Sequence, residues 1–457
     1  MNLKSFKMRL SQQKNKHIGI MDIGSNSIRL VIYRCKGNYT FPIFNERVTC
    51  KLGEGIDKSS RLKVRRINLA LNVITRFSDI MNNMNLDKKI IFATAAVRRA
   101  KNGSIFKDSA EKILKTSILV LSADEEAELV TLGITENMNK INGLIADLGG
   151  GSLEIILLKE SEVKESISLN IGHLSEKTDS EIKECLKKID WLKKGKNKTL
   201  YGVGGSFRAL GTAYIKQTNY PLFVIHGLLI NKNNCLKITK DIYKKNSNQT
   251  GIPLGRRATM PMAAIIIKNI INISKVSQLM VSGTSVRDGW IAKLNEKTIT
   301  KNENNLLSIC KEISNQTERF KGLNNSLIKL LQPVNDFFYK NDTKSLFKAA
   351  CLLSDISWNE HPDLRGTLAV DRILALSIFS ISHIERAWLA KAIYHRYIGV
   401  KENKPKLPRI GKLISRKEQK IALAIGLGLR FGHVFCAGIT SFLSEIKLKI
   451  EDDRLIC

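Results

Sequence analysis

A short pattern that could bind phosphate occurs twice in this chain, at residues 18–32 (IGIMDIGSNSIRLVI) and 143–157 (GLIADLGGGSLEIIL). When Asp22 is aligned with Asp147, the glycine two positions later and the serine five positions later also align. Each copy has an apolar stretch, an aspartate, a turn of small residues and a second apolar stretch. Such a turn places backbone N–H groups and a carboxylate at one point, which suits a phosphate and its metal ion.

The turns supply the hydrogen-bond donors that a phosphate needs. Glycines let backbone N–H groups approach phosphate oxygens closely, and serine and asparagine add side-chain donors. We therefore predict eight phosphate-binding residues: Gly24, Ser25, Asn26, Ser27, Gly149, Gly150, Gly151 and Ser152.

The carboxylates of the two copies predict a divalent cation. Asp22 and Asp147 would repel a bare phosphate, and a cation between them and the substrate removes that repulsion. Glu154 aligns with Arg29 of the first copy and follows Asp147 by seven positions. Glu154 is either a further metal-side carboxylate or an exposed strand residue. The P-loop pattern is absent from the sequence, so a different phosphate site is expected.

Strands alternating with helices are expected to hold the turns. The first copy reads as a β-hairpin, and apolar spacing predicts a helix over residues 62–84. Strands are expected at 89–93 and 118–121, each followed by a helix (ATAAVRRA and SADEEAELVTLGI), the second capped by Ser122 or Asp124.

The second copy opens a similar run. A hairpin is expected at 143–158 and a basic-ended amphipathic helix at 176–198. After these come TLYGVGGSFRALG, the apolar helix MAAIIIKNIINISK and QLMVSGTSVRDGWIAKL. This alternation predicts an α/β fold, and the repeat predicts a duplicated fold with phosphate held between its halves.

The chain changes character after about residue 303, where strand signals fade and helical periods dominate. We expect a basic tail (1–17), two α/β domains (18–140 and 141–303) and an all-helical domain (304–457). The run at 401–420 (KENKPKLPRIGKLISRKEQK) is expected to be a basic, solvated loop that leads into a helix.

Composition narrows the binding partners and the cellular location that are expected. The net charge is +32, with 74 Lys and Arg against 42 Asp and Glu. This excess fits a polyanionic partner, but it also fits a genome rich in A/T codons, which favours Lys, Ile and Asn. The eight scattered cysteines fit a reducing cytosol. No secretory signal and no membrane span of roughly 20 apolar residues is recognisable, so a cytoplasmic protein without a membrane partner is expected.

As a set, the blocks resemble the exopolyphosphatase / guanosine pentaphosphate phosphatase (Ppx/GppA) family of the actin-like ATPase and sugar-kinase superfamily. The matching blocks are DIGSNSIRLVIY, ATAAVRRA, ADEEAELVTLGI, IADLGGGSLEII, YGVGGSFRALG and VSGTSVRDGW, within residues 18–290. The resemblance implies duplicated actin-like (ribonuclease H-like) α/β domains followed by an HD-like helical domain.

The resemblance also implies roles for single residues. Glu126 matches the catalytic base, although Glu125 and Glu128 are equally first-turn acids that favour the helix dipole. Arg98 matches a phosphate-binding arginine, while Asp147 and Glu154 match the Mg²⁺-side carboxylates. Arg287 matches a basic position near the cleft, next to Asp288 where Glu is commoner. The GVGGS turn (202–206) resembles the nucleoside-side turn of the superfamily and binds either polymer phosphate or nothing.

The helical part resembles an accessory domain related to HD-type phosphohydrolases. The HD position reads Ser354-Asp355, so its histidine is missing, and the spacing of His361, His383 and His395 makes no metal site by itself. We expect a structural or polymer-holding role there.

Together these observations predict a Mg²⁺-dependent exopolyphosphatase in which water attacks the terminal phosphate of inorganic polyphosphate. One alternative is a guanosine pentaphosphate 5′-phosphohydrolase. A non-catalytic sensor of guanosine tetraphosphate or polyphosphate is another, and a sugar or carboxylate kinase is a distant one. A homodimer without a specific nucleic-acid partner is expected from the resemblance.

Overall fold

The computed structural model describes residues 16–36, 39–136, 138, 141–244, 251–295, 305–338, 344–376, 378–400, 406–451 and 454–457. Most of the basic tail and the start of the 401–420 run lie outside these ranges. The chain forms two compact units, residues 1–126 and 127–457. Among the described residues, no helix is both long enough and apolar enough to cross a bilayer.

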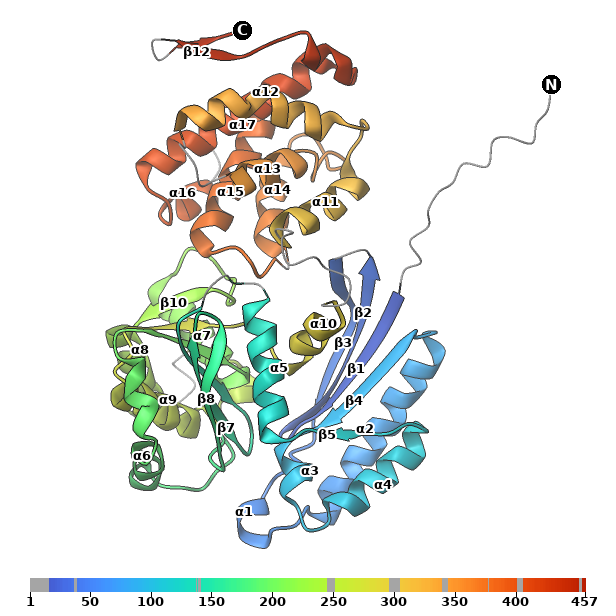
Figure 1. Cartoon of the computed structure of the whole chain (residues 1–457), viewed down its shortest axis with the longest axis vertical. Coiled ribbons are helices and arrows are strands. Elements are labelled where there is room, and N and C mark those ends of the chain that lie inside the picture. The colour runs from blue at the N-terminus through green and yellow to red at the C-terminus, as the bar shows by residue number, and fades with distance from the viewer. Residues whose placement is uncertain are drawn as a thin grey trace, which may run out of the picture. The chain divides into compact units, whose positions relative to one another are not determined.

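The first unit holds a five-stranded sheet in the order β3-β2-β1-β4-β5 (Figure 1). Strands β2 and β3 are antiparallel additions to β1, whereas β1, β4 and β5 run parallel. The strands are β1 (Lys16–Ile23), β2 (Ser27–Lys36), β3 (Tyr39–Thr49), β4 (Lys88–Ala93) and β5 (Leu119–Val120).

The second sheet repeats this order and adds one strand. Its order is β10-β11-β9-β6-β7-β8, in which β6, β9 and β11 run parallel and β7, β8 and β10 are antiparallel. The strands are β6 (Gly143–Leu148), β7 (Leu153–Lys159), β8 (Glu162–Leu169), β9 (Thr199–Val203), β10 (Leu228–Asn231) and β11 (Gln278–Val281). The shared order β3-β2-β1-β4-β5 and β8-β7-β6-β9-β11 confirms the duplicated α/β fold.

Helices pack on these sheets through buried apolar residues. The first unit has α1 (Ile56–Ser59), α2 (Val64–Asn83), α3 (Ala95–Arg99), α4 (Gly103–Leu114) and the start of α5 (Ala123–Thr135). The buried face of α2, including Ile74 and Phe77, joins Ile28, Leu30 and Ile91 of the strands in one core. The second sheet carries α6 (Asp179–Lys187), α7 (Gly205–Thr218), α8 (Lys232–Lys244), α9 (Met260–Ser274) and α10 (Val286–Asn295).

One expected helix is interrupted. The single helix predicted over 176–198 is wrong: α6 ends at Lys187, and a 3-10 helix, η1 (Asp190–Gly195), follows. Ile189 between them has an extended backbone, and Ile189 and Leu192 are both buried in the core of the second sheet. The apolar spacing was therefore read correctly as a buried face, but burial is achieved with a break in the helix.

The C-terminal part is helical, as expected. Its helices are α11 (Asn305–Thr317), α12 (Leu323–Phe338), α13 (Lys344–Leu352), α14 (Arg365–Ala375), α15 (His383–Ile398), α16 (Lys406–Gly411) and α17 (Arg416–Cys436). It ends in a 3-10 helix, η4 (Thr440–Ser444), and a hairpin of β12 (Lys449–Glu451) and β13 (Arg454–Ile456). This hairpin was not predicted, because strands of three residues are too short to show an alternating pattern.

Candidate active site

In the first unit, three candidate segments begin where three parallel strands end. Strand β1 ends at Ile23, level with Ala93 of β4, which is level with Val120 of β5. The first predicted phosphate turn (residues 24–27) follows β1, the helix with Arg98 follows β4, and the helix with Glu126 follows β5. Ligands of open α/β sheets bind at the carboxyl ends of parallel strands, so this edge is where a substrate site is expected.

Arg98 and Glu126 form an ion pair at this edge. Arg98 Nη1 donates to Glu126 Oε2 at 3.0 Å and to the Leu121 carbonyl at 2.6 Å. Glu126 is 7% exposed. Glu125 instead forms a capping box with Ser122 at the start of α5. Its carboxylate accepts from the Ser122 N–H, and its own N–H donates to Ser122 Oγ. The structure therefore separates the two glutamates, one buried beside an arginine and one at the helix cap, and identifies Ser122 as the cap.

The first turn is closed by its own backbone and supported from outside. The Gly24 N–H donates to the Ser27 carbonyl at 3.1 Å. The Asn26 carbonyl accepts from Lys51 N–H at 2.9 Å, and the Ser25 carbonyl accepts from Gly53 N–H at 2.9 Å. The turn is thus held by its own backbone and by the neighbouring segment at 51–53, while its Gly24 N–H is already used within the turn.

The second turn has the same closure. The Gly149 N–H donates to the Ser152 carbonyl at 3.0 Å, and the carbonyls of Gly149 and Gly150 accept from the His173 and Leu174 N–H groups. It follows β6, which lies level with β9 as β1 does with β4. Both predicted phosphate turns therefore form equivalent structures. That phosphate lies between the two halves stays a prediction.

Asp147 and Glu154 face each other across the second hairpin. They are direct partners in the β6–β7 register, so their side chains lie on the same face of the sheet. Glu154 is 2% exposed and accepts from Ser168 Oγ at 3.0 Å. Two carboxylates directly opposite each other repel, and carboxylate oxygens are the ligands that Mg²⁺ prefers. The donor set therefore fits the expected cation.

The first hairpin differs at the same place. There Asp22 faces Arg29, whose Nε donates to Asn45 Oδ1 at 2.8 Å. No group of three or more His, Cys, Asp or Glu side chains that could hold a metal occurs in the described part of the chain. A Mg²⁺ ion held by the Asp147–Glu154 pair would thus take its other ligands from phosphate and water, as Mg²⁺ commonly does.

Two residues near the second turn were missed by the sequence reasoning. His173 is 5% exposed, and its Nδ1 lies 3.3 Å from Ser206 Oγ, so it links the second phosphate turn to the GVGGS turn. Arg256 lies over Gly205, where an added Cβ would be 1.9 Å from its Nη2. The only available signal for Arg256 was the basic doublet in LGRRATM, and a lone histidine after a glycine gave none for His173.

Arg287 follows the third parallel strand of the second sheet. It is 7% exposed and lies in the first turn of α10, after β11. Ser285 Oγ donates to Asp288 Oδ2 at 2.8 Å, and the Ser285 carbonyl accepts from the Asp288 N–H. Asp288 thus serves the start of the helix and stabilises the turn that presents Arg287.

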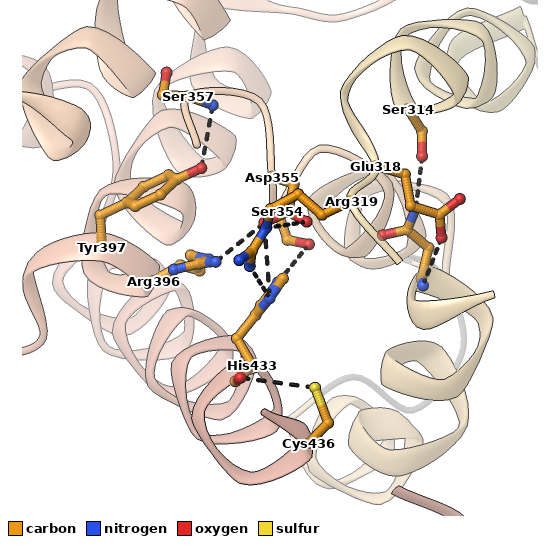
Figure 2. Close-up of polar contacts among 11 residues, drawn as sticks. Ser314, Glu318, Arg319, Ser354, Asp355, Ser357, Arg396, Tyr397, His433 and Cys436 are labelled. Carbon is orange, nitrogen blue, oxygen red and sulfur yellow. Dashed lines mark hydrogen bonds and ion pairs between the residues drawn. The ribbon is translucent and has the colours of Figure 1, made fainter. Parts of the chain in front are cut away.

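The HD-like position in the helical part is filled by an ionic cluster (Figure 2). Asp355 is 3% exposed and accepts from Arg319 at 3.2 Å and from Arg396 at 3.1 Å. His433 Nε2 lies 2.9 Å from Ser354 Oγ. Burial lowers the pKa of His433 to about 3, and the nearby Arg396 acts in the same direction. Two guanidinium groups thus neutralise the Asp355 carboxylate.

The three histidines considered from sequence lie elsewhere. His361 is exposed, with its Nδ1 3.8 Å from Asp363 Oδ2, His383 contacts the second sheet domain, and His395 Nδ1 lies 2.7 Å from the Gly399 carbonyl. The histidine beside Asp355 is His433, from a helix nearly eighty positions later in the chain, a separation that no local pattern bridges.

Two protein-family models match this chain. A model of the Ppx/GppA phosphatase family matches residues 31–298, and a model described as the exopolyphosphatase C-terminal domain matches residues 338–456. The chain belongs to the Ppx/GppA phosphatase family. The sequence-based family assignment and fold class are therefore confirmed.

Solved structures of this family share the fold. An exopolyphosphatase from Cytophaga hutchinsonii superposes with a TM-score of 0.56 at 20% identity, over 62% of this chain and 99% of the other. The Ppx/GppA family member from Aquifex aeolicus gives a TM-score of 0.52 at 22% identity, over 62% and 99%.

Proteins similar to this Ppx/GppA chain in sequence carry different activities in their names. A guanosine-5′-triphosphate,3′-diphosphate pyrophosphatase from Pseudoalteromonas atlantica is 31% identical over 33% of this chain and 30% of its own length. A bifunctional 3-dehydroquinate synthase/phosphatase from Fusobacterium nucleatum is 30% identical over 57% and 44%. The chain thus spans less than two thirds of the length of these curated relatives.

Proposed function

We propose that this chain hydrolyses the terminal phosphoanhydride bond of inorganic polyphosphate in the presence of Mg²⁺ and releases orthophosphate. The observation that carries the proposal is the pair of the buried Glu126 and the partly buried Arg98 at the carboxyl edge of the first sheet. A buried carboxylate beside an arginine combines a general base with a phosphate-binding cation, which is the pairing that water attack on a phosphate requires.

Each candidate residue has a role in this reaction. Glu126 would accept a proton from the attacking water, while Arg98 would hold and neutralise the reacting phosphate. The two rigid turns would donate N–H groups to phosphate oxygens. Asp147 and Glu154 would hold Mg²⁺, which when bound neutralises the charge on phosphate oxygens.

The cysteines support direct attack by water rather than a covalent intermediate. All eight are free thiols, and five of them are buried. Burial raises the pKa of Cys235 and of Cys310 to about 12, so these thiols stay protonated at neutral pH. A protonated thiol is a poor nucleophile.

Guanosine pentaphosphate is the second candidate substrate, and one specific observation favours it. Two relatives, from Pseudoalteromonas atlantica and Aeromonas hydrophila, are named guanosine-5′-triphosphate,3′-diphosphate pyrophosphatases. Polyphosphate is preferred because residues 338–456 match the exopolyphosphatase C-terminal model, and the net charge of +32 is compatible with a long polyanion. We further propose a cytoplasmic homodimer for the active form.

The test compares the two substrates side by side. Orthophosphate release from long-chain polyphosphate and from guanosine pentaphosphate is measured with Mg²⁺ and with a chelator. The proposal predicts Mg²⁺-dependent release with a higher kcat/KM on polyphosphate. A higher kcat/KM on the nucleotide would establish the second candidate instead. Binding of either compound without Mg²⁺-dependent release would make the chain a sensor.

A further inference from the structure

A pair of buried histidines joins the helical part of the chain to the second sheet domain. His226 and His383 are 7% and 4% exposed. His383 Nε2 lies 2.9 Å from the His226 carbonyl, and Tyr220 Oη lies 3.0 Å from His383 Nδ1. The carbonyl can only accept, so His383 donates through Nε2 and accepts the Tyr220 hydroxyl at Nδ1.

His226 makes one hydrogen bond to the second sheet domain and one to the helical part of the chain. Its Nδ1 accepts from the Gly283 N–H at 2.9 Å, and its Nε2 donates to the Phe379 carbonyl at 2.9 Å. Both ring nitrogens are therefore used, and the neutral tautomer with a proton on Nε2 is fixed. Burial lowers the pKa of His226 to about 4, which agrees with a neutral ring at physiological pH.

The Phe379 side of the joint is itself held firmly. Arg386 of α15 is 2% exposed, and its guanidinium donates to the carbonyls of Leu376 (2.8 Å) and Ile378 (2.6 Å). It also donates to the Ile373 carbonyl at the end of α14. A charged group with several carbonyl partners fixes the backbone around it, so the Phe379 carbonyl is a rigid partner for His226.

The Gly283 side leads to the candidate site. Gly283 belongs to the turn at 282–285 that starts α10 and thereby sets the position of Arg287. The turn has little room to move, because an added Cβ at Gly283 would lie 3.0 Å from the His226 Cβ. Arg208 of α7 also donates to the Gly283 carbonyl, at 3.3 Å.

We infer that His226 is a positioning residue through which the helical part of the chain holds the 282–285 turn, and with it Arg287, in place for substrate phosphate. The inference rests on the proposed function, since it assumes that Arg287 binds the substrate. It assigns the helical part a role in the reaction although its HD-like position lacks metal chemistry.

Two substitutions of His226 test its two hydrogen bonds separately. His226→Gln retains a donor near the place of Nε2 but loses the acceptor for the Gly283 N–H. His226→Asn retains an acceptor near the place of Nδ1 but loses the donor to the Phe379 carbonyl. His361→Gln, which changes an exposed histidine of the helical part, is the matched control.

The measurements are steady-state kinetics on polyphosphate and hydrogen exchange of the 282–288 backbone. For His226→Gln we expect KM to rise roughly fivefold, the effect of one neutral hydrogen bond, with kcat little changed. In an Arg287→Ala background the same substitution should leave KM unchanged. Exchange at 282–288 should be faster in both His226 variants and unchanged in the control.

Several results would overturn the inference. One is an unchanged KM and unchanged exchange at 282–288 in both folded variants. Another is an equal KM effect of His226→Gln with and without Arg287, which would indicate a purely structural role. If the wild-type chain releases no phosphate from either substrate, the proposed function fails, whereas the exchange measurement still decides whether His226 holds the turn.

Discussion

Glu126 and Arg287 lie in corresponding helices of the two copies of the fold. Each lies in the first turn of the helix that follows the third parallel strand, α5 after β5 and α10 after β11. Likewise, Asp22 faces Arg29 where Asp147 faces Glu154. At the scale of residues, the duplicated backbone therefore carries unlike side chains, with a carboxylate in one copy and a guanidinium in the other.

The contact between Gly205 and Arg256 gives a residue-scale prediction. An alanine Cβ at position 205 would lie 1.9 Å from Arg256 Nη2, so Gly205→Ala must displace that guanidinium. A flexible side-chain end moves at small cost, so we expect stability to change by less than about 1 kcal/mol. Because the displaced guanidinium lies over the GVGGS turn, we expect KM for polyphosphate to rise. Urea unfolding and steady-state kinetics check both points.

Gly172→Ala is the matched comparison. Its Cβ would lie 2.2 Å from the Gly150 carbonyl oxygen, and backbone cannot swing away as a side chain does. We expect about 1–3 kcal/mol of destabilisation. Equal stability losses in the two alanine variants would contradict this distinction.

At the scale of elements, the order of the strands locates the candidate site, and contacts between side chains far apart in the sequence stabilise it. The carboxyl ends of β1, β4 and β5 present the first turn, Arg98 and Glu126. The hairpins and the strand–turn–helix segments that form these edges could be predicted, because each is local and has its own apolar period. The pairing of His173 with Ser206 could not, because contacts across 33 positions leave no periodic signal.

The Asp355 cluster gives a prediction about helix packing. Asp355, which follows α13, accepts from Arg396 of α15 and from Arg319, which follows α11 (Figure 2). Asp355→Asn would leave two guanidinium groups without their carboxylate, and Arg396 is 5% exposed. We expect a loss on the order of 3 kcal/mol in the free energy of unfolding, measured by urea denaturation.

The control for Asp355 is an exposed ion pair. Glu46→Gln removes the partner of Arg76 at the surface, where solvent screens the interaction. This variant should unfold at nearly the wild-type urea concentration. A similar midpoint for Asp355→Asn would show that the cluster does not hold the helices together.

At the scale of the whole molecule, buried neutral histidines make stability depend on pH. Burial lowers the pKa of His226 and of His383 to about 4 and that of His433 to about 3. In the unfolded chain each would titrate near its ordinary value of about 6.5. The unfolded chain therefore binds protons that the fold excludes, and stability should fall as the pH decreases from about 6.5 towards 4.

Urea unfolding at pH 7.5, 6.5, 5.5 and 4.5 measures this dependence. We expect little change between the first two values and a steady loss below them. His226→Asn and His383→Gln should each reduce the slope. A midpoint independent of pH down to 4.5 would contradict the neutral, buried state of these rings.

The sequence was sufficient for the family, the duplicated fold and the two hairpin turns, because repeated local patterns carry all three, whereas phosphate binding by the turns stays a prediction. It was insufficient for the joint at His226 and the cluster at Asp355, which depend on contacts between segments more than 35 positions apart. It also favoured Glu126 over Glu125 only through the family resemblance. The structure adds a physical distinction, since Glu125 is used at the helix cap and Glu126 is buried beside Arg98.

Orthophosphate release by the Glu126→Gln and Glu125→Gln variants, with polyphosphate and Mg²⁺, is the most direct measurement of the proposed chemistry. Glutamine keeps the size of either side chain, and only at position 126 does it remove the proposed base. We predict that Glu126→Gln lowers kcat on the order of 100-fold or more with polyphosphate still bound, while Glu125→Gln stays close to wild type. Wild-type turnover by Glu126→Gln, or an equal loss in both variants, would contradict the assignment of Glu126 as the base.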